Sequence, residues 1–251
     1  MKILVLFGSE SDHSVFTPLI ENLNGEIDFD IISAHRSPEK LDIKLKETKA
    51  NLIIAGAGLA AHLPGVIASK TDIPVIGLPV SAALGGVDAL FSILQMPSGV
   101  PVLTSSPDDF TEIINFINNI YDSKSVARNS LNLVIKKSSL NYEYILTIIK
   151  KAKLICEEYN FKIQISEKNN PNMLNIVLRE STEEITSNNE LTINIPVLNA
   201  QKKNDPFVTM DIYKLVSSGG LWVGINNISN AIKMASKLDS LKRKLKWIYL
   251  Q

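Results

Sequence analysis

The sequence predicts an α/β protein: a three-layer α/β/α sandwich around a parallel sheet, of the flavodoxin-like or Rossmann-like class and duplicated in tandem. Continuous apolar runs of strand length, at residues 3–7, 52–54 and 75–78, alternate with amphipathic stretches. Runs without polar interruption are typical of parallel strands that are covered on both faces. The unusual turns, rich in glycine, serine or histidine, all follow predicted strands. Alternating strands and helices of this kind predict right-handed crossovers and helices on both faces of the sheet.

Composition excludes several classes of protein. The 251 residues are 45% hydrophobic and 21% charged, as is ordinary for a soluble globular protein. The formal net charge is zero, so bulk attraction to nucleic acid or to an anionic membrane is not expected. Cys156 is the only cysteine, which excludes an internal disulfide and a multi-cysteine metal site. The apolar run at residues 3–7 is too short for a signal peptide or a membrane span, so we expect a cytoplasmic protein.

The turn after the first predicted strand is Gly8-Ser9-Glu10-Ser11-Asp12. Ser9 or Ser11 can cap the next helix, expected at residues 15–24, and helix N-termini attract anions. A carboxylate such as Asp12 repels phosphate but accepts hydrogen bonds from sugar hydroxyls. A phosphorylated sugar would satisfy both features, and ordinary helix capping is the alternative.

The second predicted strand, residues 29–32, leads into Ser33-Ala34-His35-Arg36-Ser37-Pro38. Ser37 is a plausible N-cap with Pro38 at the first helical position, so His35 and Arg36 lie on the loop before the helix at residues 39–48. Arginine offers a planar fork for phosphate or carboxylate. Histidine is the side chain whose unperturbed titration falls near neutral pH. A solvated His-Arg pair without function is the alternative.

The third strand is followed by a stretch of small residues, 55–65, that contains three glycines and His62. Glycine permits a positive φ and lets the backbone approach a ligand closely. A loop of this kind suits a flat polar ligand, and a packing turn with a satisfied histidine is the alternative. Further helices are expected at residues 64–69, 87–94 and 108–121.

These turns, together with residues 79–86 after the fourth strand, are expected at one edge of the sheet. In parallel sheets, ligands bind outside the carboxyl ends of the strands. Four separate turns of suitable chemistry at this edge predict a single binding site.

The turn at residues 8–12, the loops at 33–38 and 55–65, and Gln95-Met96-Pro97-Ser98-Gly99-Val100-Pro101-Val102 resemble one known family. It is the family of N5-carboxyaminoimidazole ribonucleotide mutases and related aminoimidazole ribonucleotide carboxylases of purine biosynthesis. The resemblance covers residues 1–103, and four motifs in the right order make it specific. It implies transfer of a carboxylate from N5 to C4 of an imidazole nucleotide, without metal, organic cofactor or ATP. It also implies a homo-oligomer.

The resemblance further implies roles for individual residues. Ser9 and Asp12 would bind the ribose 5-phosphate end, Arg36 the phosphate, and His35 would shuttle the proton. His62 and the glycine stretch would line the base and the carboxylate. The implied site thus consists of catalytic His35 and His62 and of substrate-binding Ser9, Asp12, Ser33, Arg36, Ala55, Gly56, Gly58 and Leu63.

Other functions predict different residues. Carboxylases that use free carbon dioxide typically carry a Ser-Asn-Gly type of loop and a lysine in place of Arg36, so this chain resembles the mutase branch. A non-catalytic nucleotide-binding paralogue predicts loss of a motif, and a general dinucleotide enzyme predicts Gly-x-Gly-x-x-Gly after the first strand. The first half has lost none of the four motifs, and it has no Gly-x-Gly-x-x-Gly after its first strand. One departure from the family is the loop at residues 80–86, which is one residue shorter than usual and lacks Gln and Asn.

The second half, residues 125–251, can be aligned with the first, residues 1–124. Its predicted strands are 131–135, 161–165, 174–178 and 193–197, and its helices are 144–158 and 224–238. Residues 215–223 align with 94–102 without a gap, and Asn230-Ala231 resembles the usual C-terminal helix of the family. Lys168 and Asn169 stand where the first half has His35 and Arg36, and the His62 loop has no counterpart.

We therefore predict a tandem duplication whose second copy is degenerate and not catalytic. Residues 179–190 are expected to form a polar surface stretch. The second copy could lend Lys168 or the pair Asn226-Asn227 to a neighbouring site, and four chains could imitate a family octamer. An unrelated α/β domain is the alternative.

Overall fold

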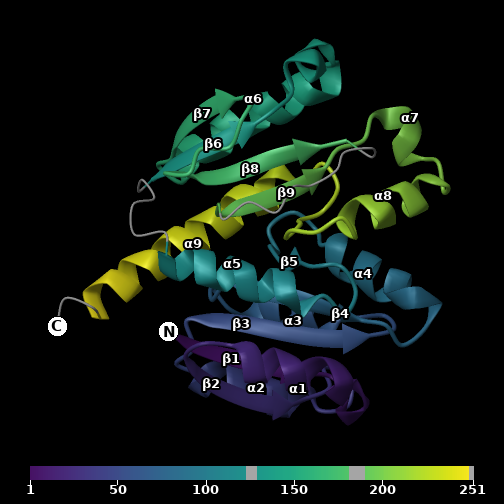
Figure 1. Cartoon of the computed structure of the whole chain (residues 1–251), viewed down its shortest axis with the longest axis vertical. Helices are drawn as coiled ribbons and strands as arrows, with labels where there is room; N and C mark the ends of the chain where they lie inside the picture. The colour runs from purple at the N-terminus through teal and green to yellow at the C-terminus, as the bar shows by residue number, and fades with distance from the viewer. Residues whose placement is uncertain (123–128, 181–189, 249–251) are drawn as a thin grey trace.

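The computed structural model of the chain describes residues 1–122, 129–180 and 190–248 (Figure 1). The first half forms a five-stranded parallel sheet with the strand order β2-β1-β3-β4-β5. Its strands are β1 Lys2–Phe7, β2 Glu26–Ile31, β3 Leu52–Gly58, β4 Val75–Val80 and β5 Leu103–Thr104. The predicted parallel sheet is confirmed.

Helices cover both faces of this sheet. The helices are α1 His13–Asn22, α2 Pro38–Glu47, α3 Leu63–Lys70, α4 Val87–Leu94 and α5 Phe110–Asp122. Alternate residues of a strand point to opposite faces, so Val5 packs with α1 and α5, whereas Leu4 packs with α2, α3 and α4. The first half is thus a three-layer α/β/α sandwich, as predicted.

The second half contains a smaller parallel sheet with the equivalent order, β7-β6-β8-β9. Its strands are β6 Ser130–Val134, β7 Lys162–Ser166, β8 Leu174–Arg179 and β9 Thr192–Pro196, and its helices are α6 Glu143–Glu158, α7 Ala200–Lys203, α8 Val208–Val216 and α9 Ile228–Ile248. The register agrees as well, because Ile3 pairs with Leu52 in the first sheet and Leu131 with Leu174 in the second. Helices α6 and α9 cover one face and share a continuous apolar core with α1 and α5.

Trp222, which is fully buried, joins the two sheets edge to edge. Its backbone exchanges two hydrogen bonds of 2.9 Å with Thr104 of β5 in antiparallel fashion. On its other side it forms a parallel bridge to Asn194 of β9, whose N–H donates to Leu221 O at 2.9 Å. The strands of the two sheets therefore run in opposite directions, as they would about a pseudo-twofold axis at this junction.

The other face of the second sheet differs from its counterpart in the first. Leu4 and Ile53 are paired neighbours in the apolar layer below α2, α3 and α4, and the equivalent pair is Asn132 and Asn175. Both asparagines are fully buried, and Asn132 Nδ2 donates to Asn175 Oδ1 at 2.9 Å. No helix connects β7 to β8, in contrast to α2 between β2 and β3. Hydrogen-bonded amides replace the apolar contacts that a covering helix would need.

Several predicted boundaries were wrong by a few residues. Strand β2 begins at Glu26 instead of Phe29, and β4 continues to Val80. The expected domain boundary at residues 124–125 and most of the expected polar stretch at 179–190 lie outside the described residues. Across the part of the chain that is described, no helix is both long and apolar enough to cross a membrane.

Candidate active site

The turn after β1 is organised by serine hydroxyls. Ser9 is the N-cap of a short 3₁₀ helix, and its Oγ accepts hydrogen bonds from Ser11 N at 3.3 Å and from Ser11 Oγ at 2.8 Å. Ser11 Oγ also donates to Asp12 Oδ1 at 3.1 Å. Asp12 is the N-cap residue of α1, but its side chain makes no capping hydrogen bond. The expectation that Ser9 or Ser11 caps the following helix was wrong for α1: Ser9 caps the 3₁₀ turn that precedes it, and neither serine is the N-cap of α1.

The loop between β2 and α2 is a hydrogen-bonded turn that points Arg36 at the β1 turn. Ser37 N donates to Ser33 O at 3.0 Å, and Arg36 N donates to Ser33 Oγ at 3.3 Å. The Arg36 guanidinium donates to Gly8 O at 3.1 Å. The predicted binding residues Ser33 and Arg36 are thus adjacent to the turn that carries Ser9 and Asp12.

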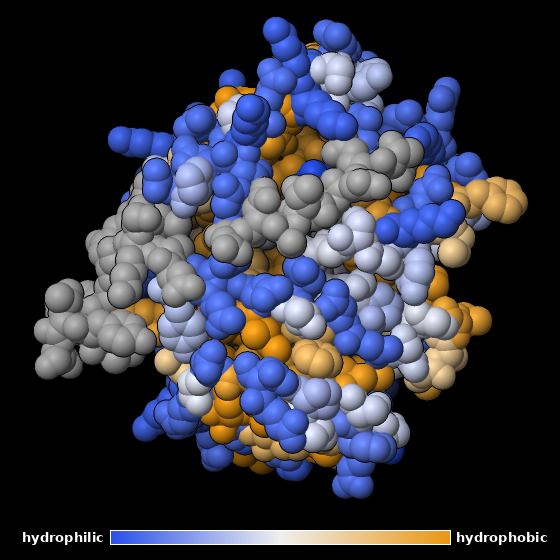
Figure 2. All heavy atoms as spheres, viewed as in Figure 1, coloured by the Kyte–Doolittle hydropathy of each residue, from blue (hydrophilic) through white to orange (hydrophobic). Residues whose placement is uncertain are grey.

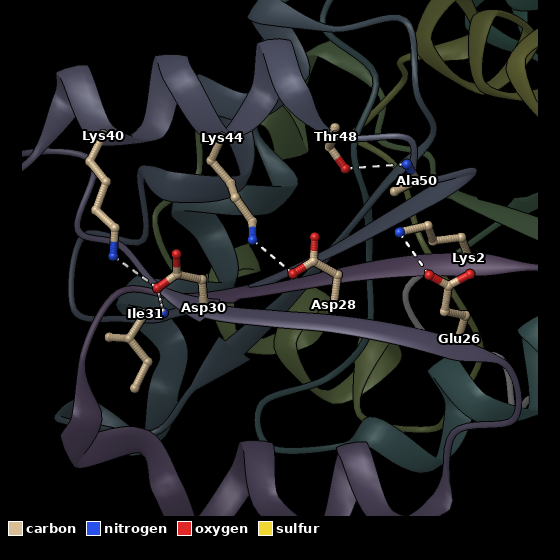
Figure 3. Close-up of polar contacts among 9 residues, drawn as sticks. All are labelled: Lys2, Glu26, Asp28, Asp30, Ile31, Lys40, Lys44, Thr48 and Ala50. Carbon is tan, nitrogen blue, oxygen red and sulfur yellow. Dashed lines mark hydrogen bonds and ion pairs between the residues drawn. The ribbon is translucent and has the colours of Figure 1, made fainter.

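Ion pairs hold the elements on both sides of this loop together (Figure 3). Lys40 and Lys44 of α2 reach Asp30 and Asp28 of the edge strand β2 at 2.9 and 2.7 Å. All four side chains are partly exposed, so each pair stabilises the fold by less than about 1 kcal/mol. They link α2 to β2, the two elements between which the loop with His35 and Arg36 lies.

The two predicted catalytic histidines are in direct contact. His62 Nδ1 lies 3.0 Å from His35 Nε2, with the rings edge to face at a centroid distance of 5.0 Å. His35 comes from the β2–α2 loop, and His62 is the N-cap residue of α3. Both rings are exposed to solvent. A hydrogen bond between two imidazoles requires one nitrogen to donate and the other to accept, so the tautomers of the two rings are linked.

The glycine stretch differs from its prediction. Residues 55–58 belong to β3, and neither Gly56 nor Gly65 has a positive φ; Leu59 does, at 52°. Gly56 serves packing, because a Cβ there would lie 2.1 Å from Phe7 Cε1. Ala55 and Leu63, predicted to bind substrate, have buried side chains in the core below the site. The surface open to a ligand begins at Gly58, which is half-buried.

Asp108, which lies at the same edge, was missed by the sequence analysis. It precedes α5, has a φ of 60°, and its Oδ1 accepts a hydrogen bond from Ser81 N at 3.0 Å. Burial raises the pKa of the Asp12 carboxyl, the hydrogen bond from Ser11 lowers it, and the negative charge of Asp108 raises it further. The signal that could have revealed Asp108 is its place just after the fifth strand, at the ligand-binding edge.

The strand ends thus bring together two histidines, an arginine, serine hydroxyls and a pair of carboxylates. The cationic Arg36 suits an anionic group such as phosphate, and Asp12 suits hydroxyl donors. The described residues contain no group of three or more His, Cys, Asp or Glu side chains that could hold a metal ion. Fold and site together define an α/β protein whose strand ends gather groups that suit a small, anionic, hydroxylated ligand beside a hydrogen-bonded pair of histidines.

Comparison with known proteins identifies the family. The sequence model described as "AIR carboxylase" matches residues 2–111. N5-carboxyaminoimidazole ribonucleotide mutase of Haemophilus influenzae is 48% identical over 110 residues, which cover 41% of this chain and 67% of that protein. The enzyme of the same name from Methanocaldococcus jannaschii is 47% identical over 109 residues, covering 42% of this chain and 69% of the relative. The chain belongs to the AIR carboxylase family.

A solved structure is also similar. The crystal structure of Treponema denticola PurE matches with a TM-score of 0.43 and 27% sequence identity, covering 48% of this chain and 82% of that one. The family model matches within the first half of the chain, in agreement with the predicted extent of the resemblance.

Proposed function

We propose that the chain is an isomerase of purine biosynthesis that converts N5-carboxyaminoimidazole ribonucleotide to 4-carboxy-5-aminoimidazole ribonucleotide. The observation that carries the proposal is the 3.0 Å contact between His35 and His62 at the binding edge. The chain that contains it is 48% identical, over 110 residues, to an enzyme named for this reaction. Ser9, Asp12, Ser33 and Arg36 are proposed to bind the ribose and phosphate.

The reaction needs a group that both gives and takes a proton. The bond from N5 to the carboxylate carbon breaks, carbon dioxide is released, and N5 takes up a proton. C4 then attacks the carbon dioxide to form the new carbon–carbon bond, and C4 loses its proton. A histidine can perform both transfers near neutral pH. We propose His35 as the proton shuttle, with His62 exchanging the proton across their shared hydrogen bond.

A second candidate is direct carboxylation of aminoimidazole ribonucleotide by free carbon dioxide. The observation that favours it is the description of the matching family as AIR carboxylase. The two reactions share the nucleotide and the new bond to C4, and they differ in the source of the carboxyl carbon.

The assay separates the two candidates and tests the role of the histidine. Purified full-length chain is given each nucleotide at low and at high bicarbonate, beside His35→Asn. Turnover of the N5-carboxylated nucleotide without bicarbonate, lost in the variant, is the expected result. Turnover of only the uncarboxylated nucleotide at high bicarbonate would replace the mutase with the carboxylase. Turnover of neither, with the nucleotide still bound, would favour the non-catalytic paralogue.

We propose that residues 125–251 are a degenerate second copy of the catalytic half, residues 1–124. The equivalent strand order, the equal register and the antiparallel junction at Trp222 support this proposal. The second copy has neither of the histidines at its strand ends, and its β7–β8 loop carries Lys168 and Asn169 instead. The non-catalytic role predicts that Lys168→Ala leaves kcat unchanged.

We also propose that the chain forms a homo-oligomer. Figure 2 shows hydrophobic side chains at the right-hand edge, where Figure 1 places α8 and the start of α4. The exposed large hydrophobic residues of this region are Leu84, Phe207 and Met210. Exposed apolar patches mark interaction surfaces. Sedimentation of wild type beside Phe207→Ser tests this assignment, and an unchanged mass for the variant would argue against it.

A further inference from the structure

Three polar side chains of the second half hold a loop of the first half. They are three residues apart, at positions 227, 230 and 233. Asn227 directly precedes α9, and Asn230 and Lys233 lie in its first two turns. Asn230 Oδ1 accepts from Gly99 N at 2.8 Å, and its Nδ2 donates to Pro97 O at 3.0 Å and to Val100 O at 3.1 Å. Asn227 Nδ2 donates to Met96 O at 3.2 Å, and Lys233 Nζ donates to Gly99 O at 2.7 Å.

Asn230 is the centre of this arrangement. Its side chain is 1% exposed, and it satisfies one N–H and two carbonyl groups of the loop at residues 97–100 at once. Gly99 has a φ of 97°, and residues 97–100 belong to no helix or strand that would hold this conformation. A buried amide with several partners of this kind fixes a loop in one conformation.

The loop in turn contacts the helix that carries His62. Met96 packs so closely on Gly65, in the first turn of α3, that a Cβ at Gly65 would lie 2.7 Å from Met96 Sδ. His62 is the N-cap residue of the same helix, and its carbonyl accepts the hydrogen bond from Val66 N at 3.0 Å. A continuous set of contacts therefore leads from Asn227 and Asn230 through Met96 to the helix turn that orients His62.

A matched contact runs in the opposite direction, from a side chain of the first half to a loop of the second half that is not part of the site. Glu112 is the third residue of α5, as Asn230 is the third residue of α9. Its carboxyl interacts with the backbone of Gly220, the residue aligned with Gly99, which also has a positive φ, 79°. Glu112 thus fixes the equivalent loop of the second half, where there are no histidines.

We propose that Asn230, assisted by Asn227, is a positioning residue for His62, so that the second half of the chain holds the proton-transfer pair of the first half in place. The proposal rests on the proposed function and deepens it: it assigns the non-catalytic copy a role in orienting the reactive histidines. The distances and the burial of Asn230 carry it.

The test compares Asn230→Ala with Glu112→Ala in the full-length chain. The chain has only three histidines, so labelling with ¹⁵N-histidine gives separate ring signals for His13, His35 and His62. The chemical shifts of the ring nitrogens report tautomer and hydrogen bonding and do not depend on turnover. We expect Asn230→Ala to change the His35 and His62 signals and to lower kcat by about 10- to 100-fold, whereas Glu112→Ala leaves both within about twofold.

Melting temperatures are measured for both variants, because a general loss of stability would affect them alike. If Asn230→Ala does not fold, Asn227→Ala replaces it and is expected to change the same two histidine signals. This variant removes the hydrogen bond to Met96 O and the one that Asn227 Oδ1 accepts from Asn230 N, and it leaves the Asn230 side chain in place. His13, which lies at the start of α1, is the internal reference.

Unchanged His35 and His62 signals in a folded Asn230 or Asn227 variant would overturn the proposal. Equal changes in the Glu112 variant would also overturn it, since they would show a global effect. Failure of the proposed function looks different: wild type would turn over neither nucleotide, while the histidine signals would still decide the positioning role.

Discussion

Gly56→Ala is the substitution that best tests why the glycine stretch of β3 is free of side chains. The added Cβ would lie 2.1, 2.4 and 2.6 Å from three ring carbons of Phe7. Carbon atoms in contact are normally about 3.5–4.0 Å apart, so the ring would have to retreat by roughly 1.5 Å. Phe7 is fully buried and packs edge-on against Phe16 at a centroid distance of 5.3 Å, which leaves the ring little room.

Overpacking of a filled core costs about 1–3 kcal/mol, and this site should lie at the upper end because a rigid ring has to move. In a protein of this size each kcal/mol lowers the melting temperature by about 2–4 °C, so a decrease of about 6–12 °C is expected. Thermal unfolding followed by circular dichroism measures it.

Gly8→Ala is the matched control, because Gly8 lies at the same edge. A Cβ there would meet Ala57 Cβ at an ordinary 3.9 Å, and Gly8 has no positive φ. We expect this variant to remain within about 0.5 kcal/mol of wild type. If Gly56→Ala keeps the wild-type melting temperature but no longer binds aminoimidazole ribonucleotide, the packing explanation is refuted and close approach of a ligand is the better one.

Three further predictions concern titratable groups. Burial raises the pKa of Asp12 in the folded state, so the folded protein binds this proton more tightly than the unfolded chain. Wild type therefore loses stability as the pH rises from the ordinary pKa of an aspartate through the raised pKa of Asp12. Asp12→Asn should lack this loss, and parallel urea midpoints for the two proteins between about pH 3 and pH 7 would contradict it. Asp108→Asn keeps an acceptor for Ser81 N but removes the charge that raises the Asp12 pKa, so the loss should move to lower pH; an unmoved profile would exclude the electrostatic coupling. Burial raises the pKa of the Cys156 thiol to about 11, so it should react with a disulfide reagent only on unfolding, and rapid labelling of the native protein would show that the thiol is accessible.

Much of the fold could be predicted because its signals are local. The apolar runs and the flanking amphipathic segments give α4 at Val87–Leu94 with the predicted limits, and α6 at Glu143–Glu158 within one residue. The limits of β2 were missed because it is an edge strand, in which Asp28 and Asp30 alternate with apolar residues and leave no continuous apolar run. These acidic residues are explained by partners on α2, which no local pattern reveals.

The site was predictable in outline but not in its packing. His35 and His62 were correctly placed at one edge because parallel strands end together, and their 3.0 Å contact follows from tertiary structure alone. The contact of Gly56 with Phe7 could not be predicted, because a glycine that makes room for a phenylalanine ring has the same sequence signature as one that makes room for a ligand. Asp108 was missed because its relation to Asp12 depends on how α5 lies beside α1.

Under the proposed duplication, the two faces of the second sheet show which features a copy retains once it no longer needs a site. Its apolar face, below α6 and α9, is shared with the core of the first half, and any polar residue there would destabilise both halves. On its opposite face, Asn132 and Asn175 replace the apolar pair Leu4 and Ile53. If Asn230 positions His62, loss of the second half should impair catalysis even though the proposed catalytic and substrate-binding residues all lie in the first half. The apolar face below α6 and α9 is then retained because it packs on the catalytic half, and α9 also carries Asn230, which holds a loop of that half.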